Sequence, residues 1–314
     1  MKVLSLLPSA TEIVYALGGQ ENLVGVSCDC DYPEDVSTKP VVSAKVLPIS
    51  STTSPAEIDR LVRDQLQVSD SIYSLDRALI QQLRPDVILA QDLCRVCAVP
   101  SGHVEEALDV IGCTADVLSL DPHSLEEVLG SISTVGSALG VSERAEAFVV
   151  DLRARLASVR TRLAGVARKR VVALEWQDPP FSCGHWVPEM IEAAGGFDPL
   201  GTPGGRSRTL TWAEIAAASP DVLVYMPCGY DLAGAVGQLP ELFSIPEFRN
   251  LPAVLADALF VTDSSAYFSR SGPRLIDGVE LLAGLLHPSH IPPPPPSRAL
   301  LVTMRKGRIE TAAP

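Results

Sequence analysis

The sequence predicts an α/β protein of two lobes, each with a mostly parallel sheet flanked by helices, joined by one long bridging helix. Three observations lead to this prediction. Apolar runs of strand length alternate with helical patterns, which is typical of parallel sheets. A long helical stripe lies near the middle of the chain, and the pattern that precedes it returns after it. The 314 residues are also enough for two lobes.

The first lobe is predicted over residues 1–141. Its opening, KVLSLLPSATEIVYALGG, indicates a strand, a turn at Pro8–Ser9 and a helix that starts near Ser9 or Thr11 and ends at Gly19. NLVGVS indicates a second strand, and SPAEIDRLVRDQL and SLDRALIQQL are helical patterns with Ser or Asp near their starts. RPDVILAQ then has the length and apolar character of a strand that is buried on both faces.

The bridging helix is predicted over residues 142–166. Its apolar residues recur at helical spacing, and Ser142 is a residue type that favours the N-cap position. Its arginines indicate a solvated face, with a surface for a partner as the alternative.

The second lobe is predicted over residues 167–290, because the patterns of the first lobe return there. Residues 170–196 resemble the opening strand, turn and helix closed by Gly-Gly, and residues 211–227 resemble LDRALIQQLRPDVILAQ. Residues 291–314 are predicted to form a C-terminal extension, in which the five prolines Pro292–Pro296 indicate a semi-rigid polyproline spacer. For its last stretch, ALLVTMRKGRIE, a hairpin around Lys306–Gly307 and a loosely held extension are both open.

Composition and charge argue against several classes of function. The formal charge of −13 disfavours nucleic-acid binding, because phosphate contacts need a dense basic face. No stretch reaches about 18 uninterrupted apolar residues, so we expect no membrane insertion. The N-terminal apolar run is too short for a signal peptide, which predicts a cytoplasmic location. No triad order, paired catalytic carboxylates or nucleotide loop emerges, so we expect no enzyme activity.

Four motifs, LLPSATEIVYALGG, RPDVILA, HWVPEMIEAAGG and YFSRSGPRLIDGVELL, carry a family likeness. In this order around the long helix, they resemble the helical-backbone (class III) substrate-binding proteins, which capture cobalamin and ferric siderophores for ABC importers. The likeness covers about residues 2–287. It implies a ligand held in the cleft between two lobes.

Two further segments, DLCRVCAV and GHWVPEMIEAAGG, look like those of a leaderless, cytoplasmic branch that is labelled cobalamin-binding. The resemblance therefore implies cobalamin or a related corrinoid as the small-molecule ligand. It also makes an ABC transporter partner doubtful, because a protein that is not exported cannot feed an importer from outside.

The candidate ligand-binding residues all follow predicted strands, since ligands of open parallel sheets lie outside the carboxyl ends of the strands. Aromatic rings would give a corrinoid broad apolar contact, an imidazole could bind a metal centre, and an arginine could meet polar substituents. The alternatives are core packing, a histidine bonded to backbone and a solvated loop charge. The candidates are Pro8, Ser9, Thr11, Tyr32, Asp92, Cys94, Cys97, Trp176, His185, Trp186, Tyr230, Tyr267 and Arg270.

Cysteines suggest a second kind of site. Cys28-x-Cys30 and Cys94-x-x-Cys97 both follow predicted strands of the first lobe, and four thiolates would suit zinc or an iron–sulfur cluster. A redox dithiol usually opens a helix, and Pro100 directly after the second pair makes that geometry poor. Thiols that only line the cleft are the remaining alternative.

These observations predict a non-enzymatic protein that binds a corrinoid or a similar large metallated ligand between two lobes. One alternative is a metal-handling or redox protein that uses Cys28, Cys30, Cys94 and Cys97. Another is an interaction protein with a degenerate cleft.

Overall fold

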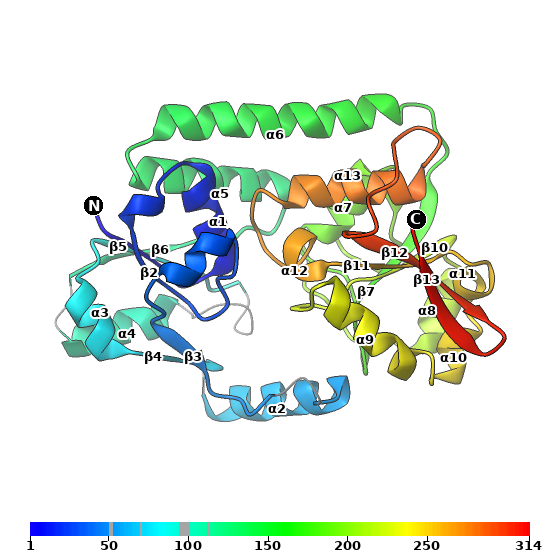
Figure 1. The fold of residues 1–314 in the computed structure, drawn as a ribbon, viewed down its shortest axis with the longest axis horizontal. Helices are drawn as coiled ribbons and strands as arrows, with labels where there is room; N and C mark the ends of the chain where they lie inside the picture. The colour runs from blue at the N-terminus through cyan, green and yellow to red at the C-terminus, as the bar shows by residue number, and fades with distance from the viewer. Residues whose placement is uncertain (50–52, 70, 94–100, 112–113) are drawn as a thin grey trace. The chain divides into compact units, whose positions relative to one another are not determined.

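The computed structural model describes residues 1–49, 53–69, 71–93, 101–111 and 114–314 (Figure 1). The chain forms two compact units. Unit 1 comprises Met1–Pro122 and Glu126–Val150, and unit 2 comprises His123–Leu125 and Asp151–Pro314. The border between them lies inside the long helix α6 (Ser142–Arg162). The predicted α/β fold, with parallel strands flanked by helices, is confirmed.

Unit 1 is built on a parallel sheet in the order β2-β1-β5-β6, beside a separate antiparallel pair, β3-β4. Leu4 of β1 and Ile88 of β5 are fully buried in one apolar cluster, as their apolar runs predict. The elements of this unit are β1 (Val3–Ser5), α1 (Pro8–Ala16), β2 (Leu23–Val26), β3 (Ser43–Lys45), α2 (Pro55–Val68), β4 (Tyr73–Leu75), α3 (Arg77–Leu83), β5 (Val87–Ala90), α4 (Ser101–Ile111), β6 (Asp116–Ser119) and α5 (Leu125–Ala138), with 3-10 turns at Gln20–Asn22 and Glu34–Thr38.

The helices of unit 1 begin at residues whose chemistry suits a helix start. Helix α1 begins at Pro8, slightly before the predicted start. Proline suits this position because it has no N–H, and an N–H in the first turn of a helix has no partner within the helix. Ser54 caps α2 by accepting the Glu57 N–H at 3.3 Å, and Asp76 caps α3 by accepting the Leu79 N–H at 2.9 Å.

Unit 2 is built on a larger, mixed sheet in the order β13-β12-β11-β10-β7-β8, with β9 also paired to β7. Strands β11, β10 and β7 are parallel, and the outer strands β8, β12 and β13 are antiparallel. The elements of this unit are β7 (Lys169–Gln177), β8 (Pro180–Ser182), α7 (Val187–Ala193), β9 (Gly196–Phe197), α8 (Trp212–Ala218), β10 (Val222–Tyr225), α9 (Leu232–Leu242), α10 (Pro246–Arg249), α11 (Pro252–Leu255), β11 (Leu259–Thr262), α12 (Ser264–Tyr267), α13 (Leu275–Leu286), β12 (Ala299–Arg305) and β13 (Arg308–Ala312).

A Pro-Asp pair precedes the corresponding strand of each unit, β5 or β10. Just before it, Arg84 and Ser219 end the preceding helices in the left-handed conformation, with φ of 51° and 45°. The Asp86 carboxylate accepts a backbone N–H next to β1 at 2.6 Å, and that of Asp221 accepts one in β7 at 2.8 Å. The sequence repeat therefore corresponds to a repeated local structure, in which a left-handed helix end and a Pro-Asp pair precede a strand.

Helix α6 buries an apolar stripe at the helical spacing that the sequence predicts, which includes Val149, Leu152 and Leu156. Within unit 2, Arg155 of this helix donates to the carboxylates of Asp277 and Glu280 on α13, at 2.5 and 2.6 Å. These charge-assisted hydrogen bonds join the second half of α6 to α13. Within the described ranges, no helix is both long and apolar enough to cross a membrane.

The proline segment, residues 292–296, runs along α13. A Cβ atom on Gly284 of that helix would overlap the Pro292 carbonyl oxygen and lie 3.1 Å from the Pro293 Cα, so the first prolines are packed and not part of a free spacer. The hairpin β12-β13 follows, red in Figure 1, and β12 pairs with β11. Of the two alternatives for the last residues, the structure has the hairpin.

Candidate ligand site

Three predicted ligand-binding residues, Pro8, Ser9 and Thr11, lie in the first turn of α1, just after β1. All three are buried. The Thr11 hydroxyl donates to the Ser5 hydroxyl at 2.8 Å and lies 3.1 Å from the Sγ atom of Cys30. Thr11 therefore belongs to a polar network inside unit 1.

The predicted thiolate site involves cysteines in different environments. Cys28 is exposed, whereas Cys30 is partly buried between the hydroxyls of Thr11 and Ser27. Cys94 and Cys97 lie outside the described residues, so the four-thiolate site stays a prediction. In the described part of the chain, no group of three or more His, Cys, Asp or Glu side chains is placed to hold a metal ion.

Tyr32 and Asp92 both follow strands of unit 1 and are exposed, Tyr32 by 47%. The Asp92 carboxylate accepts hydrogen bonds from the backbone N–H of Ser101, at 2.8 Å, and from its hydroxyl. Asp121 in turn accepts the N–H groups of Asp92 and Leu93, at 2.5 and 2.8 Å. Asp92 thus has a structural role at the start of α4, and Tyr32 presents aromatic surface to solvent.

In unit 2, Trp176, near the carboxyl end of strand β7, and Tyr230, in the loop after β10, form an aromatic pair. Their ring centroids are 5.9 Å apart, their planes are inclined by 51°, and both side chains are half-buried. Burial, and less strongly the charge of Glu241, raises the pKa of Tyr230, so its phenol stays protonated and can donate a hydrogen bond. The pair offers apolar area together with a polar group.

The remaining aromatic candidates of unit 2 have partners within it. The buried Trp186 donates its indole N–H to the Phe268 carbonyl at 2.8 Å, which favours the core-packing alternative. Tyr267 is half-buried, and the Arg298 guanidinium lies 5.3 Å from its ring centroid. Arg270 is half-buried in the segment after α12.

His185 lies in the loop between β8 and α7, in the left-handed conformation, with φ of 51°. Its N–H donates to the Gly205 carbonyl at 2.5 Å, and its carbonyl accepts the Gly204 N–H at 2.9 Å. A Cβ atom on the neighbouring Gly184 would overlap the Ser207 nitrogen. The two loops, 183–186 and 202–208, therefore touch backbone to backbone and fix the conformation of His185.

The imidazole of His185 has an unusual environment. Its Nε2 atom is buried and has no hydrogen-bond partner. The ring centroid of His123 lies 6.1 Å from that of His185, and the ring of Trp186 lies 5.5 Å away on centroids. Burial, followed by the charges of His123 and Arg206, lowers the pKa of His185 below its ordinary 6.5, so the ring is neutral at pH 7.

Glu175, at the end of β7, holds the two loops of this site together. Its carboxylate accepts the Gly184 N–H at 3.2 Å and the Ser207 hydroxyl at 2.5 Å. Sequence reasoning gave Glu175 and His123 no role. The position of Glu175 beside Trp176 at a strand end was an available signal, whereas nothing in the sequence placed His123 near His185.

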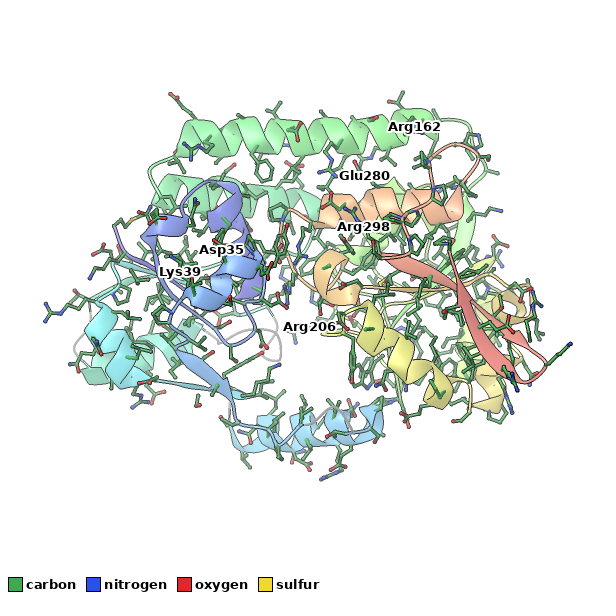
Figure 2. The ribbon with its side chains drawn as sticks, viewed as in Figure 1. Asp35, Lys39, Arg162, Arg206, Glu280 and Arg298 are labelled. Atoms are coloured by element: carbon green, nitrogen blue, oxygen red, sulfur yellow. The ribbon has the colours of Figure 1, made fainter. Side chains whose placement is uncertain are left out.

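A groove of about 280 Å³ lies elsewhere in unit 2, between α6, α13 and the proline segment. Arg162, Glu280 and Arg298 border it and are labelled in Figure 2. This volume is below the range of about 300–1,000 Å³ that is common for drug-sized ligands, and a corrinoid needs more. The groove also lacks aromatic side chains, so it does not suit the predicted ligand.

Comparisons with known proteins agree on one family. A family model described as "Periplasmic binding protein" matches residues 3–266. An uncharacterized ABC transporter substrate-binding lipoprotein of Bacillus subtilis is 24% identical over 293 residues, which cover 91% of this chain and 80% of that protein. A vitamin B12-binding protein of Yersinia pestis is 22% identical over 278 residues, which cover 88% of this chain and 82% of that protein.

Among solved structures, a periplasmic heme-binding protein from Pseudomonas aeruginosa superposes with a TM-score of 0.69 at 22% sequence identity, covering 100% of this chain and 98% of that one. This likeness supports the two-lobe α/β fold. The homologues are solute-binding proteins and not enzymes, which confirms the prediction that this chain has no enzymatic role.

Proposed function

Because this chain belongs to the periplasmic binding protein family, we propose that it binds a large metallated ligand, either a corrinoid or a related heme or iron chelate. The names of its relatives support this ligand class, since one binds vitamin B12 and another binds heme. That the ligand also contacts the first lobe, as the family resemblance implies, stays a prediction.

The observation that carries this proposal is the aromatic pair of Trp176 and Tyr230. Trp176 lies at the carboxyl end of β7 and Tyr230 follows that of β10, which is the end of parallel strands where ligands of such sheets bind, and both residues keep exposed surface. A macrocycle has broad apolar faces and a polar rim, and the pair matches it with two aromatic faces and one phenol hydroxyl.

Visible absorption titrations with cobalamin and with heme test the proposal. We expect saturable binding by the purified chain and a loss of about tenfold or more in affinity for Trp176→Ala, because a central aromatic anchor is removed. Phe197→Ala is the matched control, since Phe197 is an exposed aromatic residue paired with the opposite end of β7. No binding of cobalamin, heme or an iron chelate would refute the proposal.

The cellular role follows from the relatives only in part. One relative is an ABC transporter substrate-binding lipoprotein, which supports a substrate-binding role beside an ABC transporter. The cytoplasmic location and the doubt about a transporter partner stay predictions from the sequence. Fractionation of cells that express the full gene, followed by immunoblotting of each fraction, tests the location.

A further inference from the structure

The groove between α6, α13 and the proline segment offers a second binding surface within unit 2. Its most buried residues are apolar, and we call them the apolar lining: Val159, Leu281 and Ile291, with exposed fractions of 3–5%. Prolines 292–295 border the groove as well and add no N–H groups. The polar side chains of the groove are half-buried or exposed. A ligand there would therefore meet apolar surface at its deepest contacts and polar groups nearer to solvent.

The acidic side chains of this groove have Arg155 as their counter-charge. Its guanidinium donates to both carboxylate oxygens of Glu280, at 2.9 and 2.6 Å, and to the carboxylate of Asp277 at 2.5 Å. Charge-assisted hydrogen bonds of this length are strong, so both carboxylates stay with Arg155. Three arginines and these two carboxylates give the groove a formal charge of +1, in a chain with a formal charge of −13. The groove therefore favours anions locally in an acidic protein.

The other two arginines of the groove, Arg162 and Arg298, are held by neutral groups. Arg162 donates to the His290 carbonyl at 2.5 Å, and the Arg298 guanidinium lies 5.3 Å from the ring centroid of Tyr267. The backbone N–H of Arg298 also donates to the Pro295 carbonyl at 2.9 Å. Among the described residues, neither arginine forms an ion pair. The two guanidinium groups are thus positioned, and their charges are not neutralised.

The size and charge of the groove define a ligand class. Its volume of about 280 Å³ equals that of roughly nine water molecules, which limits a ligand to about ten heavy atoms. Guanidinium groups bind carboxylates through paired N–H···O bonds, and Arg162 and Arg298 reach the groove from different segments, at the end of α6 and before β12. A short chain with a carboxylate at each end offers one anion to each arginine and methylene groups to the apolar lining. A single inorganic oxyanion would leave that lining uncovered.

We propose that this groove binds a short aliphatic dicarboxylate, with one carboxylate bound by Arg162 and the other by Arg298 (Figure 2). The methylene chain lies on the apolar lining. This inference goes beyond the proposed function and does not depend on it, because neither Trp176 nor Tyr230 borders the groove.

The test is isothermal titration of the full-length protein, in a low-salt buffer, with malonate, succinate, glutarate and adipate. Inorganic phosphate and the neutral diamide of succinate are the comparison probes. We expect one dicarboxylate per chain, an affinity that peaks at one chain length, weaker binding of phosphate and no binding of the diamide. Added NaCl should weaken the binding, because the guanidinium groups are exposed and therefore screened.

Variants of the two arginines test their roles. Arg162→Gln and Arg298→Gln should each lower the affinity for the best dicarboxylate by about tenfold or more, because each removes a charge-assisted pair of hydrogen bonds. Arg160→Gln and Arg308→Gln are the matched controls, since both arginines are exposed in unit 2 and neither borders the groove. These controls should bind as the wild type does.

A variant that changes no charge tests the groove itself. Ser158 borders the groove and is exposed on α6, so Ser158→Phe should fill the groove without disturbing the core. We expect this variant to lose dicarboxylate binding while its thermal unfolding stays close to that of the wild type. Thermal unfolding of every variant separates a loss of binding from a loss of folding.

Three results would overturn the inference. The first is that no dicarboxylate binds the folded wild type, and the second is that phosphate binds as tightly as the best dicarboxylate. The third is an equal loss of affinity in the control and groove variants, which would show a general effect of charge. The titrations with cobalamin and heme are independent, so the proposed function can stand where this inference fails, and the reverse also holds.

Discussion

The two units share their framework but differ in the segment that comes after their first strand. In each, a left-handed helix end, a Pro-Asp pair and a carboxylate bonded to the neighbouring backbone precede a buried strand. In unit 1, β1 leads directly into α1, and the nearby hydroxyls bond to one another. In unit 2, β7 leads into the β8 hairpin and the His185 loop. The repeated framework provides stability, whereas the inserted hairpin provides unit 2 with its distinctive polar groups.

Glycine substitutions should show this difference most strongly. At Gly184 of unit 2, a Cβ atom would overlap the Ser207 nitrogen and lie 2.8 Å from the Arg206 carbonyl carbon, and these backbone atoms cannot rotate away. Gly184→Ala should therefore lower the free energy of unfolding by about 2–3 kcal/mol, measured by urea denaturation. Gly130→Ala in α5 of unit 1, where the new Cβ meets nothing within 4 Å, should raise it by about 0.5–1 kcal/mol. Equal effects at both sites would contradict the comparison.

The shared carboxylates should have effects of similar size in the two units. Asp86→Ala and Asp221→Ala each leave a backbone N–H without its acceptor, so each should cost about 1–2 kcal/mol of unfolding free energy. Chemical denaturation of the two single variants measures this. A large loss at one position and none at the other would show that the repeat is not energetically equivalent.

The left-handed helix ends should give a smaller gain. Arg84→Gly and Ser219→Gly each replace a side chain that disfavours positive φ, so each should raise stability by about 0.5–1 kcal/mol. Thermal denaturation is sensitive enough to detect this. A gain at only one of the two helix ends would reveal different local strain in the two units.

The smallest expected effect is a pH dependence confined to unit 2. The pKa of His185 is lowered in the folded chain, so the unfolded chain takes up this proton first as the pH falls through about 6.5. Stability should therefore decrease below that pH, and the decrease should level off below the folded-state pKa. The difference between wild type and His185→Asn isolates this contribution. Identical pH profiles for the two proteins would rule it out.

The framework could be predicted from sequence because its signals are local. RPDVILAQ contains β5, Ser142 begins α6, and the Pro-Asp repeat marks the corresponding strands of both units. The residues of the candidate site were harder to predict from the sequence. Trp176 and Trp186 both lie near strand ends, yet the Trp186 indole is hydrogen-bonded in the core, and residue type alone does not separate these cases. The proximity of His123 and His185 depends on tertiary packing of segments far apart in the chain.

The C-terminal hairpin has a consequence for self-association. Strand β12 covers β11, whose central residues Phe260 and Val261 are apolar, and β13 forms the outer edge of the sheet with the charged residues Arg308 and Glu310. Charged edge strands resist pairing with other molecules, whereas apolar ones invite it. A chain shortened before residue 297 would leave β11 as an apolar edge, and we expect it to aggregate as it folds. The last eighteen residues therefore protect the sheet of unit 2 from aggregation.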